Sequence, residues 1–93
     1  MLQTNQFIQA MSQHFDHSVA SCSDDELFAA GYLRGHIDLA VGTLQLTEQP
    51  FSIAMLAAQV EQSLQQAIVA GELSSADQQL VLSIWQQLQS LQG

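Results

Sequence analysis

Apolar residues recur every three or four positions along this chain, and no stretch alternates strictly between apolar and polar residues. The first spacing is typical of helices with one buried face, whereas strict alternation indicates a strand. Short breaks interrupt the repeat, which predicts helices over residues 5–20, 24–45, 50–70 and 75–91. Because connections this short favour antiparallel neighbours, we expect an all-α fold, a single domain over residues 1–93 built as an up-down-up-down four-helix bundle.

Local signals indicate where several of these helices begin or end. Thr4 is placed to cap the first helix. Ser23 and Glu26 have the spacing of a capping box at the start of the second helix. Pro50 suits the first turn of the third helix, and Gly71 suits the left-handed residue that ends it.

The predicted helix over residues 24–45 is apolar on two sides. Its wide apolar face is opposed by a second strip, and three glycines form a ridge beside that strip. A helix apolar on two sides is usually packed between others, so we expect it to be central, with the ridge allowing close approach of another helix of the same domain. Replacing Gly31 by Leu would then overpack the contact and destabilise the fold. The strip comprises Phe28, Tyr32, Leu39 and Leu46, and the ridge Gly31, Gly35 and Gly42.

The last predicted helix has its own apolar face, and Trp85 lies at the edge of that face. We therefore expect the indole to lie at the margin of the core.

Composition favours a cytoplasmic protein. Hydrophobic residues make up 47% of the 93 residues, enough for a core, and the single cysteine, Cys22, rules out an internal disulfide. A lone thiol fits a reducing compartment. The first residues lack the positive and apolar regions of a signal peptide. No apolar run approaches the roughly 20 residues that a membrane-spanning helix requires.

The charge balance limits the partners. Nine acidic residues face a single basic one, Arg34, which gives a net charge of −8. Nucleic acid and anionic membrane surfaces both attract basic side chains, so we expect neither as a partner. A charged partner would be basic.

Three polar residues of the second helix, Asp25, Tyr32 and His36, lie on one line between its two apolar faces. Tyr32 and His36 are four residues apart, so their side chains are neighbours. Two interpretations stay open. The line is either a small polar ligand-binding cleft or a hydrogen-bonded seam at the edge of the core, where burial requires partners for polar groups.

Arg34 also permits two interpretations. It would bind a carboxylate or phosphate of a ligand, or it would form an ordinary surface ion pair with Asp38, which lies four residues later in the sequence.

We expect no metal, no cofactor and no catalytic residue. His14, His17 and Cys22 offer too few convergent ligands for zinc, and the histidines are expected to be solvated. No residue pattern marks a nucleophile with its activating base.

Surplus apolar residues indicate a contact surface. Phe51 and Met55 lie off the main stripe of the third helix, and Phe28 and Leu39 lie off the principal face of the second. Either the two strips meet inside the monomer, or part of this surplus reaches the surface as an interface. The partner would then be a second copy, giving a homodimer, or a different protein.

The block Ser23–His36, SDDELFAAGYLRGH, resembles the YfcL family of small gammaproteobacterial proteins. The stretch AGELS at residues 70–74, followed by Asp77 and Gln78, is similar to the family's turn into its last helix. The resemblance implies a bacterial cytosolic protein and supplies no activity, cofactor or catalytic residue.

Taken together, these patterns predict a non-enzymatic helical module of the bacterial cytosol that binds another protein. The alternative is a small-molecule or anion binder, or a minor enzyme, that uses the line of Asp25, Tyr32 and His36 together with Arg34. A well-formed concave pocket beside His36 would favour the alternative, and a flat or convex surface there would exclude it.

Overall fold

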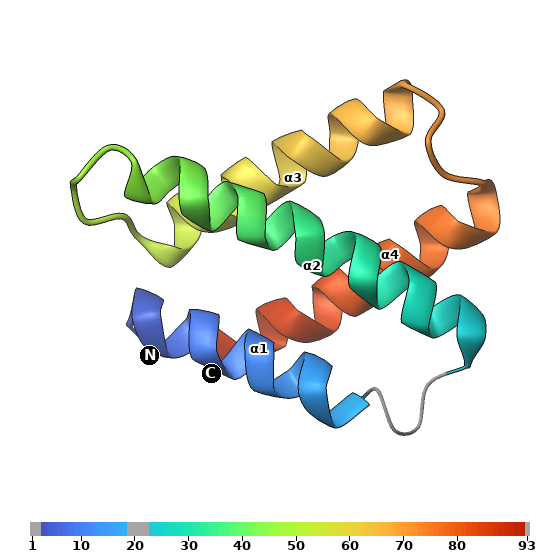
Figure 1. Ribbon diagram of the computed structural model, residues 1–93, viewed down its shortest axis with the longest axis horizontal. Helices are drawn as coiled ribbons and strands as arrows, with labels where there is room; N and C mark the ends of the chain where they lie inside the picture. Colours follow the sequence, from blue (N-terminus) through green and yellow to red (C-terminus); the bar gives the residue numbers. More distant parts are fainter. Residues whose placement is uncertain (1–2, 19–22, 93) are drawn as a thin grey trace.

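The computed structural model describes residues 3–18 and 23–92, and the regular structure within them is helical. Successive helices run in alternating directions along the chain (Figure 1). The all-α class predicted from the apolar spacing is confirmed. The elements are α1 (Thr4–Ser18), α2 (Asp24–Gln45), α3 (Ile53–Val69), α4 (Ser75–Gln89) and a short 3-10 helix, η1 (Ser90–Gln92).

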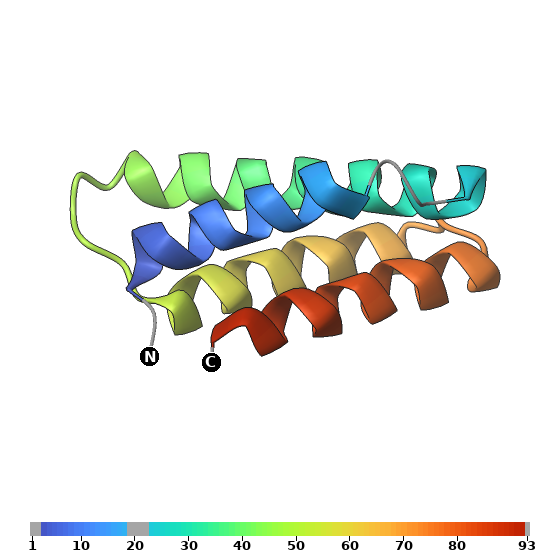
Figure 2. The ribbon, with the colours of Figure 1, turned by 90° about the horizontal axis from the view of Figure 1, so that it is seen from below.

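The helices form two layers, with α1 and α2 in one and α3 and α4 in the other (Figures 1 and 2). The layers cross obliquely, so α2 packs against both α3 and α4. The shortest dimension of the molecule is 19 Å, which is the thickness of two helices of about 10 Å each. One side of α2 is therefore covered by the second layer.

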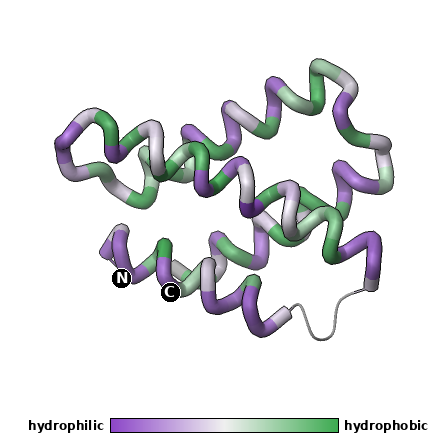
Figure 3. Tube along the Cα trace, viewed as in Figure 1, coloured by the Kyte–Doolittle hydropathy of each residue, from purple (hydrophilic) through white to green (hydrophobic). Residues whose placement is uncertain are grey.

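The core lies between the layers and receives residues from every helix. Hydrophobic and hydrophilic positions are interleaved along each helix (Figure 3), as expected for helices with one buried face. Its largest fully buried side chains are Phe7, Met11, Leu33, Leu56, Val60, Val81 and Leu88.

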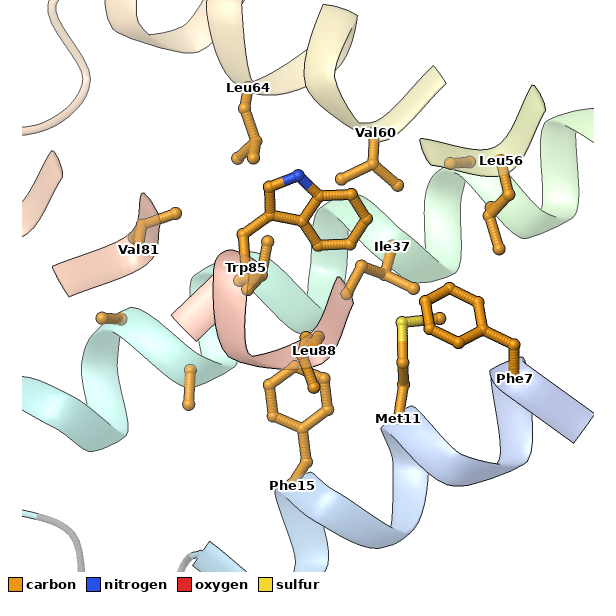
Figure 4. Close-up of a cluster of buried hydrophobic side chains, with 14 of the residues drawn as sticks. Phe7, Met11, Phe15, Ile37, Leu56, Val60, Leu64, Val81, Trp85 and Leu88 are labelled. Carbon is orange, nitrogen blue, oxygen red and sulfur yellow. The ribbon is translucent and has the colours of Figure 1, made fainter. Parts of the chain in front are cut away.

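Trp85 belongs to this core and not to its edge, which corrects the expectation from the sequence. The side chain is 4% exposed and lies in the buried cluster with Leu64 and Leu88 (Figure 4). Val81, Trp85 and Leu88 follow the i, i+4, i+7 spacing of one helix face. The indole Nε1–H donates to Glu61 Oε1 at 3.2 Å, so burial of the ring leaves no polar group unpaired.

Two helix ends are formed as the sequence predicts. The Ser23 hydroxyl accepts from the Glu26 amide at 3.2 Å, and the Glu26 carboxylate accepts from the Ser23 amide at 3.1 Å. Hydrogen bonds from Ser23 to the carboxylate, the one from its amide foremost, lower the pKa of Glu26. Gly71 has φ +77 and ends α3, and the amide of Glu72 donates back to the Ala67 carbonyl at 3.1 Å.

Two other helix starts differ from the prediction. Thr4 lies inside α1, where its hydroxyl donates to the Phe51 carbonyl at 2.7 Å instead of capping the helix. Helix α3 begins at Ile53 and not near Pro50, because the Ser52 hydroxyl accepts from the Met55 amide at 3.1 Å and so acts as the cap.

The expectation that α2 is packed on both sides is wrong. The side chains of Phe28, Leu39 and Leu46 are 52%, 63% and 83% exposed. A Cβ atom added at Gly31, Gly35 or Gly42 would meet nothing within 4 Å. The glycine ridge therefore faces open space, and overpacking gives no reason for Gly31→Leu to destabilise the fold.

Candidate functional site

The second apolar side of α2 is a surface, which we name the outer strip. Its members lie opposite the buried face that contains Leu33 and Ile37. It comprises Phe28, Gly31, Tyr32, Gly35, His36, Leu39, Gly42 and Leu46.

Three rings follow one another on successive turns of the outer strip. The centroids of Phe28 and Tyr32 are 6.1 Å apart, and those of Tyr32 and His36 are 4.8 Å apart. Both separations lie in the range of favourable contacts between tilted rings. The i, i+4 spacing on one helix produces this order, as the sequence predicts for Tyr32 and His36.

Tyr32 is held from the side by the turn that follows α3. Its hydroxyl donates to Glu72 Oε1 at 2.8 Å. Burial of the ring, followed by the hydrogen bond and negative charge of Glu72, raises the pKa of Tyr32 to about 12. Glu72 directly follows Gly71, so the left-handed glycine that ends α3 also places this carboxylate beside α2.

His36 is bonded to Ser63 on α3, with 2.5 Å between Nδ1 and Oγ. A hydroxyl beside an imidazole is the pairing that activated serine nucleophiles use. Here, however, Ser63 lies in the middle of a helix, where neighbouring backbone amides are used in helical hydrogen bonds and cannot stabilise an oxyanion. No carboxylate orients the imidazole within residues 3–18 and 23–92. The pair therefore forms a hydrogen bond that links α2 to α3.

Two hollows adjoin Leu39, and the one over the outer strip is open to solvent. One, of about 320 Å³, lies over the glycines and rings of the outer strip, and the other, of about 180 Å³, lies between α2 and α3. Neither is lined by Asp, Glu, Lys or Arg. The first is lined by Gly31, Tyr32, Gly35, His36 and Leu39, and the second by Leu39, Ala40, Thr43, Gln59, Gln62, Ser63 and Gln66.

The residues predicted to bind a ligand do not converge. Tyr32 and His36 are in contact, whereas Asp25 is exposed in the first turn of α2. Arg34 faces α1, where its Nη1 lies 3.3 Å from Asp16 Oδ1.

The predicted pairing of Arg34 with Asp38 is wrong, because Arg34 turns to α1. Its Nη2 donates to the Ser12 hydroxyl at 3.0 Å, and its guanidinium carbon lies 5.5 Å from the centroid of the Phe15 ring. The pair on α2 would have the basic residue before the acidic one, the less favourable order on a helix. On α1 the guanidinium of Arg34 stacks over Phe15 and donates hydrogen bonds to Ser12 and Asp16, which is more favourable than a single pair with Asp38.

Three of the four predicted interface residues are exposed. Phe28 and Leu39 lie on the outer strip, and Met55 is 51% exposed on α3. Phe51 instead packs partly buried against the core.

No group of three or more His, Cys, Asp or Glu side chains that would hold a metal occurs among the described residues. His14 and His17 lie on α1, and Cys22 lies outside the described residues.

A groove between α3 and α4 was not predicted from the sequence. It has a volume of about 300 Å³ and an apolar floor that includes Leu64 and Trp85. Glu61 Oε1 accepts from Trp85 Nε1 and, at 3.0 Å, from Gln89 Nε2. Glu61 and Trp85 are 24 residues apart, so only the register between the two helices reveals the contact.

In the part of the chain that the structure describes, no helix is both long enough and apolar enough to cross a membrane.

These features define an all-helical protein with an exposed, largely uncharged strip along its second helix. The chain belongs to the YfcL family, whose model, described as YfcL protein, matches residues 5–90. It is 49% identical over 73 residues to the "Uncharacterized protein YfcL" of Escherichia coli strain K12, and the match covers 78% of each chain. The resemblance found in the sequence is thereby confirmed. No solved structure matches the chain significantly.

Proposed function

We propose that this chain is a non-enzymatic helical interaction module of the bacterial cytosol, and that it docks another protein on the outer strip of α2. One observation carries the proposal. Phe28, Leu39 and Leu46 are large, apolar and more than half exposed on the outer strip, at 52%, 63% and 83%. Apolar area buried by a partner contributes roughly 25 cal/mol per Å².

The glycines of the strip support the same proposal. A glycine inside a helix costs about 0.5–1 kcal/mol relative to alanine. Gly31, Gly35 and Gly42 all lie within α2, and none of them makes room for another segment among residues 3–18 and 23–92. Local choices that lower stability without a structural gain tend to occur at functional sites. Here they leave the α2 backbone open to close approach by a partner.

The geometry gives less support to the small-molecule or anion-binding alternative. The hollow beside His36 is open to solvent, whereas small-molecule sites bury most of the ligand surface. The Tyr32 hydroxyl and His36 Nδ1 are already bonded to Glu72 and Ser63. Arg34 is bonded to Asp16 on α1, so it does not add a positive charge to this hollow.

Site-specific photo-cross-linking in living bacteria tests the docking surface. A photoreactive amino acid placed at Leu39 is expected to give a discrete adduct with another protein. The matched control is Gln79, which is exposed on α4 and is expected to give none. Absence of an adduct from Leu39, or the same adducts from both positions, would reject the outer strip as a docking surface.

A further inference from the structure

The margins of the outer strip are acidic, and this property bears on the kind of partner. Asp24 and Asp25 lie one turn before Phe28, at one end of the strip. Asp38 directly precedes Leu39, and Glu72 bonds to the Tyr32 hydroxyl. All four carboxylates belong to exposed residues.

No Lys or Arg side chain lies at that margin. Arg34 is the only Lys or Arg in the sequence. Its guanidinium lies 3.3 Å from Asp16 on α1 and stacks over Phe15. The acidic margin therefore surrounds an apolar floor without a compensating positive charge from Lys or Arg.

We propose, building on the docking function above, that the partner is an amphipathic helix of another protein whose apolar stripe is flanked by Lys and Arg. Protein interfaces commonly have an apolar centre and a polar rim, and complementary charge across the rim selects the partner. An amphipathic helix lying along a hydrophobic surface is a recurrent mode of recognition. The span from Phe28 to Leu46 is about five helical turns at 3.6 residues per turn, long enough to receive such a helix.

Charge disfavours a second copy of this chain in the same place. Each copy has a net charge of −8. Pairing two outer strips would bring two acidic margins together, and juxtaposed like charges oppose association. A helix with basic flanks gains from the same margin.

Two synthetic helical peptides test this partner chemistry. Both carry the same stripe of Leu and Ala, one with Lys along its flanks and the other with Glu, and binding is measured by calorimetry with the full chain. We expect the Lys peptide to bind and to lose at least tenfold in affinity between 50 and about 300 mM salt, because counterions screen charged contacts. We expect no measurable binding of the Glu peptide. NMR amide shifts caused by the Lys peptide are expected to concentrate on the outer strip.

Two double variants distinguish the effect of carboxylates at the strip from the effect of the overall net charge on peptide binding. Asp38→Asn with Glu72→Gln removes two carboxylates at the strip, and we expect at least a fivefold loss of affinity for the Lys peptide. Glu61→Gln with Asp77→Asn removes two carboxylates from α3 and α4 and is expected to change it less than twofold. Circular dichroism of both double variants verifies that each remains folded.

Four outcomes would overturn the partner chemistry. Equal weakening by the two double variants would mean that net charge alone attracts the peptide. Equal binding of the Lys and Glu peptides would leave an apolar docking surface without charge selection. Binding of neither peptide, together with a Leu39 cross-link to another protein, would reject the basic helix while retaining the docking function. A Leu39 cross-link that forms only with a second copy of this chain would contradict a partner helix from another protein.

Discussion

Tyr32 connects the outer strip to the turn after α3 and is the only tyrosine in the chain. Its ring contacts the rings of Phe28 and His36, while its hydroxyl donates to Glu72. Burial and the adjacent carboxylate both disfavour the phenolate. The ionisation of this one side chain therefore reports on whether α2 and the turn are packed together.

Absorbance titration of the tyrosinate is expected to give a midpoint near pH 12 in the folded protein, because the pKa of Tyr32 is raised to about 12. The unfolded chain in urea should titrate near the ordinary value of 10. A pKa raised by folding means that the stability gained from the neutral phenol is complete below pH 10 and is lost as the pH rises through 12. Glu72→Gln should lower the midpoint only in part, because burial is the larger cause. A folded midpoint near 10 would contradict this packing.

The glycines of the outer strip allow a second test at single residues. Gly35→Ala is expected to raise the free energy of unfolding by about 0.5–1 kcal/mol, because the new Cβ meets nothing within 4 Å. Gly71→Ala is expected to lower it, since φ is +77 there and L-residues disfavour that region by roughly 1–2 kcal/mol. Urea unfolding measures both. If Gly35→Ala were destabilising, the backbone at that position would be covered and the outer strip would not be open.

Among the helices, two end signals contained within four or five residues were predicted correctly from the sequence. The capping box of Ser23 and Glu26 and the left-handed Gly71 depend on neighbouring backbone groups alone. Thr4 was predicted wrongly because its hydroxyl bonds to the Phe51 carbonyl, 47 residues away. Such a partner is known only when the register between elements is known.

The same distinction holds for the candidate site. The contact between Tyr32 and His36 follows from the spacing on one helix. Their partners Glu72 and Ser63 lie 40 and 27 residues away, and no sequence pattern connects them. The two-sided apolar pattern of α2 did not reveal that its second side is open, because an apolar side that stays exposed has the same composition as one covered within the chain.

Ser23→Ala tests the contribution of one helix end. Loss of the cap is expected to lower the free energy of unfolding by about 1 kcal/mol in urea at pH 7. Because folding lowers the pKa of Glu26 from its ordinary value of 4.5, the contribution of its carboxylate is present above that pH and is lost as the pH falls through the folded pKa. Ser83→Ala, at an exposed position inside α4, is the control and should change stability little. Equal effects of the two variants would show that the capping box does not stabilise α2.

The whole molecule combines an apolar core with a surface that carries one basic residue and nine acidic ones. Glutamine occupies many of the exposed helix positions that charged residues often fill, including Gln62, Gln65, Gln66, Gln86 and Gln87. Self-repulsion of a net charge of −8 opposes contact between copies of the chain, while the outer strip leaves apolar area exposed. From these two properties we predict whether the chain associates with itself.

Sedimentation equilibrium across a hundredfold concentration range is expected to give the monomer mass of 10.1 kDa at low salt. The physical reason is that a dimer through the outer strip would bring two chains of charge −8 into contact and oppose their acidic margins. Screening at 1 M salt weakens that repulsion, since the Debye length falls to about 3 Å, so any weak self-association should appear there first. The Leu39→Ser variant shows which surface is used in any self-association. It should abolish salt-induced association through the outer strip and leave association through other surfaces unchanged. A dimer mass at low salt that Leu39→Ser abolishes would instead make the outer strip a contact between copies, and the inference of a basic partner helix would be wrong.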